Sequence, residues 1–193
     1  MIFIDQEKKQ ILSNNCLNCQ DPFFQPPNRQ FAKVGCCSYS PSFYLLEIAK
    51  MCLDNPSFFI NSILTHPNAE RFAYSIKVHA NVHPAYEKTS RGHLSKLERD
   101  DLKLSYSTCQ YFHNGCSLNP SYKNAVCRTF ICMSVEDSLD EEQKELLQKW
   151  TKTFSKEEMD FQIKHEAELN KRGIDLIEDP VQVIQYFRKL NDS

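Results

Sequence analysis

The sequence has little glycine, no long apolar run and no strong excess of charge. Only four glycines occur among 193 residues, and no glycine-rich phosphate loop is present. The first fifteen residues lack the apolar stretch of a secretory signal, and no segment approaches about 18 uninterrupted apolar residues. We therefore expect no transmembrane helix, and the expected location is the cytoplasm.

The formal net charge of −2 gives no reason to expect nucleic acid or an anionic membrane as a partner. The charge is unevenly distributed. Residues 1–135 carry 14 Lys and Arg against 10 Asp and Glu, whereas residues 136–193 carry 9 against 15. We expect a cysteine-cluster domain over 1–135 and a helical extension over 136–193 packed on it. The acidic helical tail is a possible surface for a protein partner.

Helix-start signals recur along the chain, so the expected fold is mainly helical. Ser40 and Pro41 predict one helix start, and Asn55 and Pro56 predict another. Residues 68–79 form a weaker helical candidate, and a short helical pattern lies within 93–102. Any strands are expected to be short.

The C-terminal third has clearer signals. Ser138 with Glu141, and Ser155 with Glu158, fit a reciprocal capping pattern. They predict helices over about 139–153 and 156–172. Gly173 is expected to end the second helix, and Asp179 with Pro180 to begin the last one. Apolar stripes indicate that these helices pack against the rest of the chain.

Nine cysteines stand out against this background. An odd number fits poorly with a fully paired disulfide framework, and a cysteine cluster in a reducing cytosol more often binds metal or performs redox chemistry. Cys52 lies on the predicted apolar face of the helix after Pro41, which indicates a small core residue. The other eight are candidate metal ligands: Cys16, Cys19, Cys36, Cys37, Cys109, Cys116, Cys127 and Cys132.

The spacing of these cysteines suits metal binding. Cys16 and Cys19 form a CxxC pair, in which a tight turn directs both sulfurs at one ion. The side chains of Cys36 and Cys37 are expected to diverge and to serve separate ions or separate corners of a cluster. Gly35 before them indicates a sharp turn. Arg128 and Lys33 are the expected local donors to sulfur.

A CxxC, a CC, a segment with "LLEIAK", a Cys, a Gly-Cys and a Cys-Arg-x-Phe follow one another over residues 16–132. This order resembles the bacterial and archaeal YkgJ-like, or CxxCxxxxCC, cysteine-cluster family. The chain would be a divergent member, since sixteen residues separate Cys19 from Cys36. The resemblance implies chelation of zinc or iron. It matches Cys109, Cys116 and Cys127 to family positions and leaves Cys132 the least secure of the eight.

Four thiolates suit either tetrahedral Zn²⁺ or an iron–sulfur cluster such as [4Fe–4S], and the sequence does not separate these. His113, between Cys109 and Cys116, is an alternative ligand. His79 and His83 are weaker candidates, for which a solvated or capping role is favoured.

Two functions remain open from the sequence. The first is a structural or interaction module organised by the metal. The alternative is an enzyme that depends on an iron–sulfur cluster, because a broadly similar cysteine region occurs in flagellin lysine-N-methylases. No nucleophile–base pair or radical-type CxxxCxxC is recognised, so no catalytic residue is assigned. Thiol–disulfide exchange and zinc-dependent nucleic-acid binding lack the expected scaffold.

Overall fold

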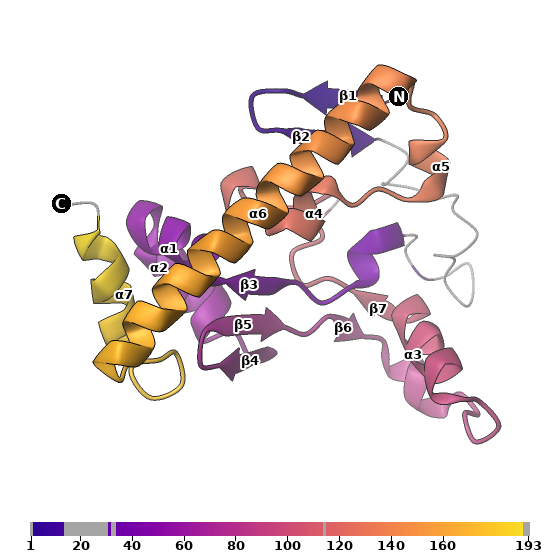
Figure 1. Ribbon diagram of the computed structural model, residues 1–193. Coiled ribbons are helices and arrows are strands. Elements are labelled where there is room, and N and C mark those ends of the chain that lie inside the picture. Colours follow the sequence, from indigo (N-terminus) through magenta and orange to yellow (C-terminus); the bar gives the residue numbers. More distant parts are fainter. Residues whose placement is uncertain (1, 14–30, 32–33, 114, 191–193) are drawn as a thin grey trace.

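The computed structural model describes residues 2–13, 31, 34–113 and 115–190. Its regular structure is mainly helical, as expected, with small antiparallel sheets between the helices (Figure 1). The α-helices are α1 Leu45–Asp54, α2 Pro56–Phe58, α3 Lys96–Ser105, α4 Ala125–Thr129, α5 Met133–Glu136, α6 Glu141–Arg172 and α7 Pro180–Lys189. Within the described ranges, none of the helices combines the length and the apolar character needed to span a lipid bilayer.

Short strands make three antiparallel sheets. They are β1 Ile2–Asp5 with β2 Gln10–Ser13, then β3 Ser42–Tyr44, β5 Ser75–Val78 and β4 Ala69–Phe72 in that order, and β6 Asn81–Val82 with β7 Ser107–Thr108. The prediction of a helix over 68–79 was wrong, because this stretch forms the β4–β5 hairpin. Strand pairing also moves the start of α1 away from Pro41: Phe43 is buried and pairs with Ile76 of β5.

Several predicted helix ends are confirmed. Asn55 Oδ1 accepts a hydrogen bond from the Phe58 amide at the start of α2, which continues into the π-helix η4 Phe59–Leu64. Gly173 ends α6 in the left-handed conformation with φ of 66°. Asp179 and Pro180 begin α7.

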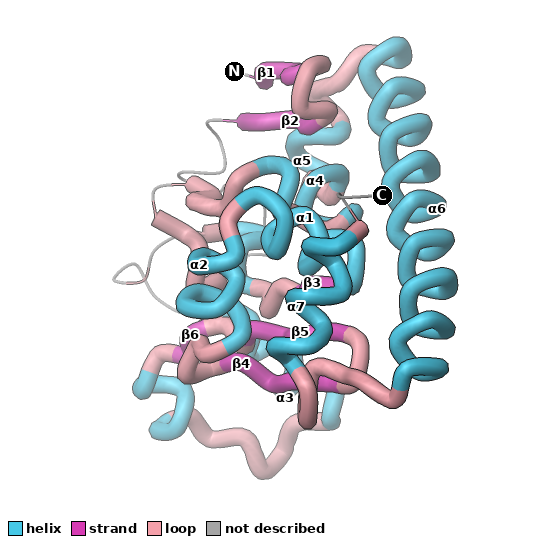
Figure 2. The backbone as a smooth tube through the Cα atoms, turned by 90° about the vertical axis from the view of Figure 1, so that its left-hand side faces the viewer, coloured by secondary structure: helices cyan, strands magenta, loops and turns pink. Residues whose placement is uncertain are grey.

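The two predicted helices over 139–153 and 156–172 are one continuous helix of 32 residues. Its N-cap is Asp140, which shares reciprocal hydrogen bonds with Gln143, while the Ser138 hydroxyl donates instead to the Ser134 carbonyl. Ser155 lies inside the helix, because nothing there interrupts the helical hydrogen bonding. In Figures 1 and 2, α6 runs along the whole body of the molecule.

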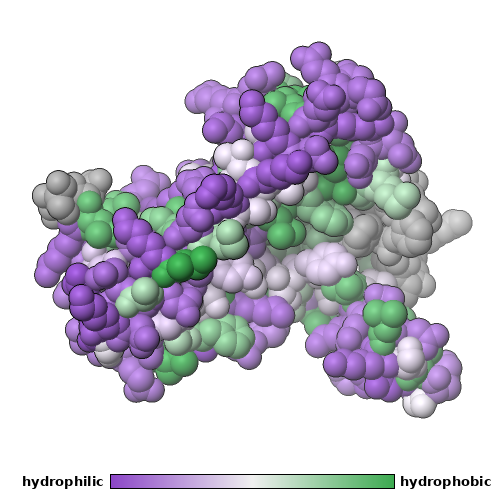
Figure 3. Space-filling view, in the orientation of Figure 1, coloured by the Kyte–Doolittle hydropathy of each residue, from purple (hydrophilic) through white to green (hydrophobic). Residues whose placement is uncertain are grey.

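Two apolar clusters form the interior. The larger one packs α1 and β5 against α7 and the C-terminal part of α6, with Ile48, Leu169 and Phe187 at its centre. The smaller one packs Leu147, Trp150 and Phe154 of α6 against Ile11 of β2 and Ala125 of α4. Figure 3 shows mainly hydrophilic residues along the outer face of α6. Cys52 is fully buried in the larger cluster, which confirms its expected role as a core residue.

Candidate metal centre

The Cys36–Cys37 segment lies beside Cys109, although the two are far apart in the sequence. Gly35 has φ of 57° and opens the short 3-10 helix η3 Gly35–Ser38, so the sharp turn expected there is confirmed. The Cys109 amide donates to the Cys37 carbonyl over 2.6 Å. This hydrogen bond joins the two cysteine-bearing segments directly.

Cys109 and Cys116 are carried by one tight loop. Phe112 and Cys116 form an isolated antiparallel bridge, and the Ser117 amide donates to the Tyr111 carbonyl over 2.8 Å. The loop is fixed to the interior by Tyr111, which is buried and donates its hydroxyl proton to the Ser62 carbonyl over 2.8 Å.

Cys127 lies on α4, whose first turn has two side-chain acceptors. Asn124 Oδ1 accepts from the Cys127 amide over 2.7 Å, and Glu158 Oε2 accepts from the Ala125 amide over 2.9 Å. Both satisfy amides that have no partner within a helix. Because Glu158 belongs to α6, the long helix fixes the position of the cysteine-bearing helix.

Four thiols interact electrostatically at this place: those of Cys37, Cys109, Cys116 and Cys127. Burial, followed by the negative charge of Cys37 and Cys116, raises the pKa of Cys109 to about 11. Part of Cys127 is exposed at the surface. Two effects nevertheless raise the pKa of its thiol to about 12: partial removal from water, and the negative charge of the other three thiols. The structure therefore brings these four predicted ligands into one region.

Cys37 also interacts with its neighbour in the sequence. A hydrogen bond with the Cys36 thiol, together with burial, raises the pKa of Cys37 well above its ordinary value. The two adjacent thiols therefore lie close enough for Cys36 to affect Cys37, and the expectation that they serve separate ions or separate corners of a cluster stays a prediction. Cys37 departs from helical geometry inside η3, with φ of −74° and ψ of 16°.

A buried lysine, which was not predicted from the sequence, lies near two of the four thiols, those of Cys37 and Cys127. Lys123 is only 7% exposed, and its positive charge lowers the pKa values of Cys37 and Cys127 against the other effects. Its Nζ donates to Gln10 Oε1 over 3.1 Å. Tyr122, the preceding residue, is buried and donates its hydroxyl proton to Asp54, which fixes the backbone at this point.

A second, smaller group of cysteines borders a cavity of about 50 Å³. Cys36 and Cys132 both line it, together with apolar side chains that include Ile11, Val34 and Val135. Cys36 thus lies between the two groups: it interacts with Cys37 of the four-thiol region, and it also lines this cavity. Nearby, the buried Ser38 hydroxyl has no hydrogen-bond partner among the described residues.

Other predicted participants lie elsewhere. Arg128 was expected to donate to sulfur, but its Nη2 donates to the Lys8 carbonyl over 2.9 Å and its guanidinium stacks 3.8 Å from the Phe154 ring centroid. His79 pairs with Glu70 over 2.8 Å. His83 Nδ1 accepts from the Ala85 amide over 3.1 Å, which is the capping role favoured from the sequence. His113 is exposed at the tip of the Cys109–Cys116 loop.

Cys16, Cys19 and Lys33 lie outside the described residues. Among those that are described, no three His, Cys, Asp or Glu side chains stand together in an arrangement ready to hold a metal ion, and no disulfide joins two of the described cysteines. The four interacting thiols are the donor type that zinc and iron–sulfur clusters use, so the residues suit such a group in their chemistry.

Comparisons with protein-family models, with curated proteins and with solved structures each return no match.

Proposed function

We propose that this chain is a metal-binding cysteine-cluster protein, which uses zinc or an iron–sulfur cluster to organise a structural or interaction module. The observation that carries the proposal is the hydrogen bond between the Cys109 amide and the Cys37 carbonyl, which joins two cysteine-bearing segments. Cys127 lies close enough to Cys37, Cys109 and Cys116 for their charges to raise its pKa. Four thiols from three separate segments repel one another once ionised, and a metal cation relieves that repulsion. Cys36, Cys132, Cys16 and Cys19 are the further thiols of the proposed centre.

The charge of the surroundings supports this proposal. Metal ligation requires thiolates, so binding releases protons and is favoured by nearby positive charge. Lys123 supplies a buried cation whose only hydrogen bond among the described residues is to the neutral Gln10 amide. Burial of an ammonium group is costly unless an opposite charge accompanies it. A thiolate centre provides that charge.

Either zinc or an iron–sulfur cluster would draw the four sulfurs closer together than they lie without it. Zinc would then act as a cross-link between η3, the Cys109–Cys116 loop and α4. An iron–sulfur cluster would do the same and would add the capacity to accept or donate an electron. In both cases this chain contributes the thiolates, the Lys123 charge and the hydrogen bonds that hold the three segments.

The test is to purify the full chain without oxygen and to measure zinc, iron and acid-labile sulfide per chain, together with the visible spectrum. We expect either about one or two zinc ions and no colour, or iron and sulfide in comparable amounts with a broad band near 400 nm. The Cys109→Ser variant should lose most of the metal, whereas Cys52→Ser, which alters a buried cysteine outside the region, should retain it. A metal-free protein with reduced thiols and undiminished stability would contradict the proposal.

A further inference from the structure

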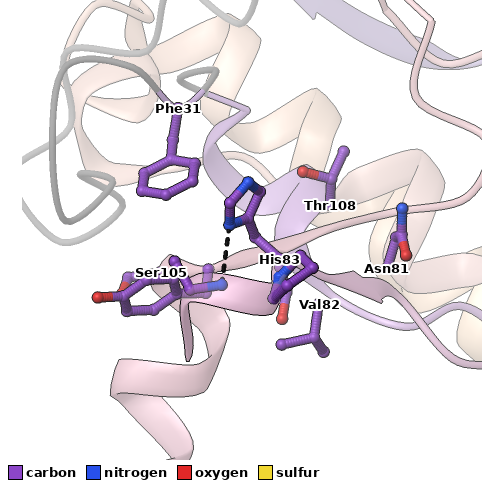
Figure 4. A pocket seen from close by; sticks show the side chains of 10 residues that line it. Phe31, Asn81, Val82, His83, Ser105 and Thr108 are labelled. Atoms are coloured by element: carbon purple, nitrogen blue, oxygen red, sulfur yellow. Dashed lines mark hydrogen bonds between the residues drawn. The ribbon is translucent and has the colours of Figure 1, made fainter. Parts of the chain in front are cut away.

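A cavity of about 630 Å³ lies beside α3. One of its lining residues, Thr108, directly precedes Cys109 in the sequence. Its walls come from Phe31, from β6 and β7, and from the segments that follow β6 and end α3 (Figure 4). Its volume is typical of pockets that bind small molecules. The lobe that carries α3 projects from the body in Figure 3.

Aromatic rings gather on one side of this cavity. The Phe31 ring lies 4.4 Å from that of His83 at an interplanar angle of 72°, and 5.6 Å from that of Tyr106 at 62°. Both contacts are edge to face, so the rings do not cover one another's faces fully. Phe31 is only half-buried. A planar ring can therefore stack against these side chains.

Two polar side chains of the cavity, His83 and Asn81, can form hydrogen bonds with the edge of such a ring. Because His83 Nδ1 accepts from the Ala85 amide, the ring proton is on Nε2, which is left as a donor. In Figure 4 this second nitrogen points toward the space between Phe31 and Thr108. Asn81, which also lines the cavity, offers both a donor and an acceptor in its amide.

The charge of the lining residues limits the class of ligand that the cavity can bind. None of the described residues that line the cavity is Asp, Glu, Lys or Arg, so these residues offer neither a phosphate nor an ammonium group an ion-pair partner. We propose that this cavity binds an uncharged, planar heteroaromatic compound of the nucleobase type, as the free base or its nucleoside. The aromatic rings stack on its face, while His83 and Asn81 hydrogen-bond to its edge. This inference does not rest on the metal proposal.

The test uses adenine, adenosine, adenosine 5′-monophosphate and ribose as probes, with calorimetry on the full chain. We expect adenine and adenosine to bind saturably and ribose not to bind. The monophosphate should bind no more tightly than adenosine, and a gain of tenfold or more would overturn the argument from charge. The absence of saturable binding by both adenine and adenosine would overturn the proposal.

Matched variants locate the site. Phe31→Ala should weaken adenosine binding by about tenfold or more, the usual effect of removing an aromatic ring that stacks on a base. Phe72→Ala, which removes an exposed phenylalanine from β4, should leave it unchanged. Phe31→Leu retains apolar bulk without the aromatic ring and should weaken binding similarly, which guards against a folding defect in the alanine variant. Unchanged affinity in both Phe31 variants would place any binding elsewhere.

The histidine is tested in the same way. His83→Phe keeps a ring but removes the Nε2 donor, and we expect several-fold weaker binding of adenine. His79→Phe, which alters a surface histidine paired with Glu70, is the control. Metal content is measured in every variant, and it should remain that of the unaltered protein, because none of these residues belongs to the proposed centre. Equal adenine affinity in the two histidine variants would refute the role of His83.

Discussion

Glu47 is an ionisable residue placed inside the apolar body. It is 2% exposed, and its Oε2 accepts a hydrogen bond from the Tyr44 amide over 3.1 Å at the start of α1. Burial, reinforced by the negative charge of Glu158, raises its pKa from an ordinary 4.5 to about 8. The protonated form is therefore the one that suits the fold near neutrality.

This raised pKa predicts that stability falls as pH rises. Between pH 4.5 and about pH 8 the folded protein holds a proton on Glu47 that the unfolded chain has released. The free energy of unfolding should therefore decrease by up to about 1.4 kcal/mol per pH unit over this window from Glu47 alone. Below pH 4.5 its contribution is fully present. Urea unfolding of the unaltered protein and of Glu47→Gln between pH 5 and pH 8 measures the difference.

In Glu47→Gln the part of the slope that Glu47 causes should vanish, since an amide can still accept from Tyr44 but cannot ionise. Glu87→Gln changes an exposed carboxylate whose partner, Arg91, stays charged throughout this pH range, and it should keep the slope of the unaltered protein. Parallel pH profiles for the unaltered protein and Glu47→Gln would show that Glu47 ionises at its ordinary pKa.

Lys123 is another buried ionisable residue, and its replacement separates metal affinity from stability. Lys123→Met removes the cation that faces Cys37 and Cys127, so zinc affinity should fall by about 10- to 100-fold, as for other groups around metal ligands. Stability of the metal-free protein should change little, because an apolar side chain of similar length avoids the cost of burying charge. Chelator competition measures the affinity.

Lys50→Met is the matched control for Lys123→Met, because Lys50 is a half-buried lysine that pairs with Glu157 over 3.8 Å. Its zinc affinity should match that of the unaltered protein. Equal affinities in the two lysine variants would remove Lys123 from the proposed centre.

At the scale of elements, α4 depends on α6 for its position. The Glu158 carboxylate accepts from the Ala125 amide over 2.9 Å, so Glu158→Ala should lower the free energy of unfolding by about 1–2 kcal/mol. It should also lower metal occupancy, since Cys127 is two residues farther along α4. Glu157→Ala, one residue away and half-exposed, is expected to do neither. Denaturant unfolding and metal content measure both effects, and identical values in the two variants would argue against the anchor.

The contact between Glu158 and the Ala125 amide shows which sequence signals predict helix ends correctly and which do not. Signals that act within one turn, such as Asn55 with Pro56 and Gly173 at the end of α6, were interpreted correctly because their partners are adjacent. Ser155 with Glu158 resembled a helix start, but Glu158 bonds to α4 rather than to its own helix. The pairing of β5 with β3 and the position of Lys123 beside two of the thiols depend on contacts between distant residues, which periodicity does not reveal.

For the eight candidate ligands, too, the local pattern was predictable from the sequence, whereas the contacts between distant segments were not. Their clustering in polar segments was visible in the sequence, and the interaction of Cys37, Cys109, Cys116 and Cys127 is in keeping with it. Which of them gather depends on η3 lying beside Cys109, a contact between segments. The ligand assignment and the division of the chain at residue 135 remain predictions.

At the scale of the whole molecule, α7 closes the larger apolar cluster. Val183 of α7 is fully buried there, whereas Val181 on the same helix is 62% exposed. Val183→Ala should therefore cost about 2 kcal/mol of unfolding free energy through lost burial and the cavity left behind. Val181→Ala should change it by less than about 0.5 kcal/mol. Denaturant unfolding of both variants measures this, and equal losses would place α7 outside the core.

The continuous helix α6 has a further mechanical consequence. Its 32 residues span about 48 Å at the usual rise per residue, and one end is fixed in each of the two apolar clusters. The helix thus acts as a rigid connection that holds the α7 end of the molecule at a fixed distance from the cysteine-bearing end. Because a long helix bends only gently while its hydrogen bonds stay intact, we expect motion of one end to reach the other mainly as rotation or translation of the whole helix.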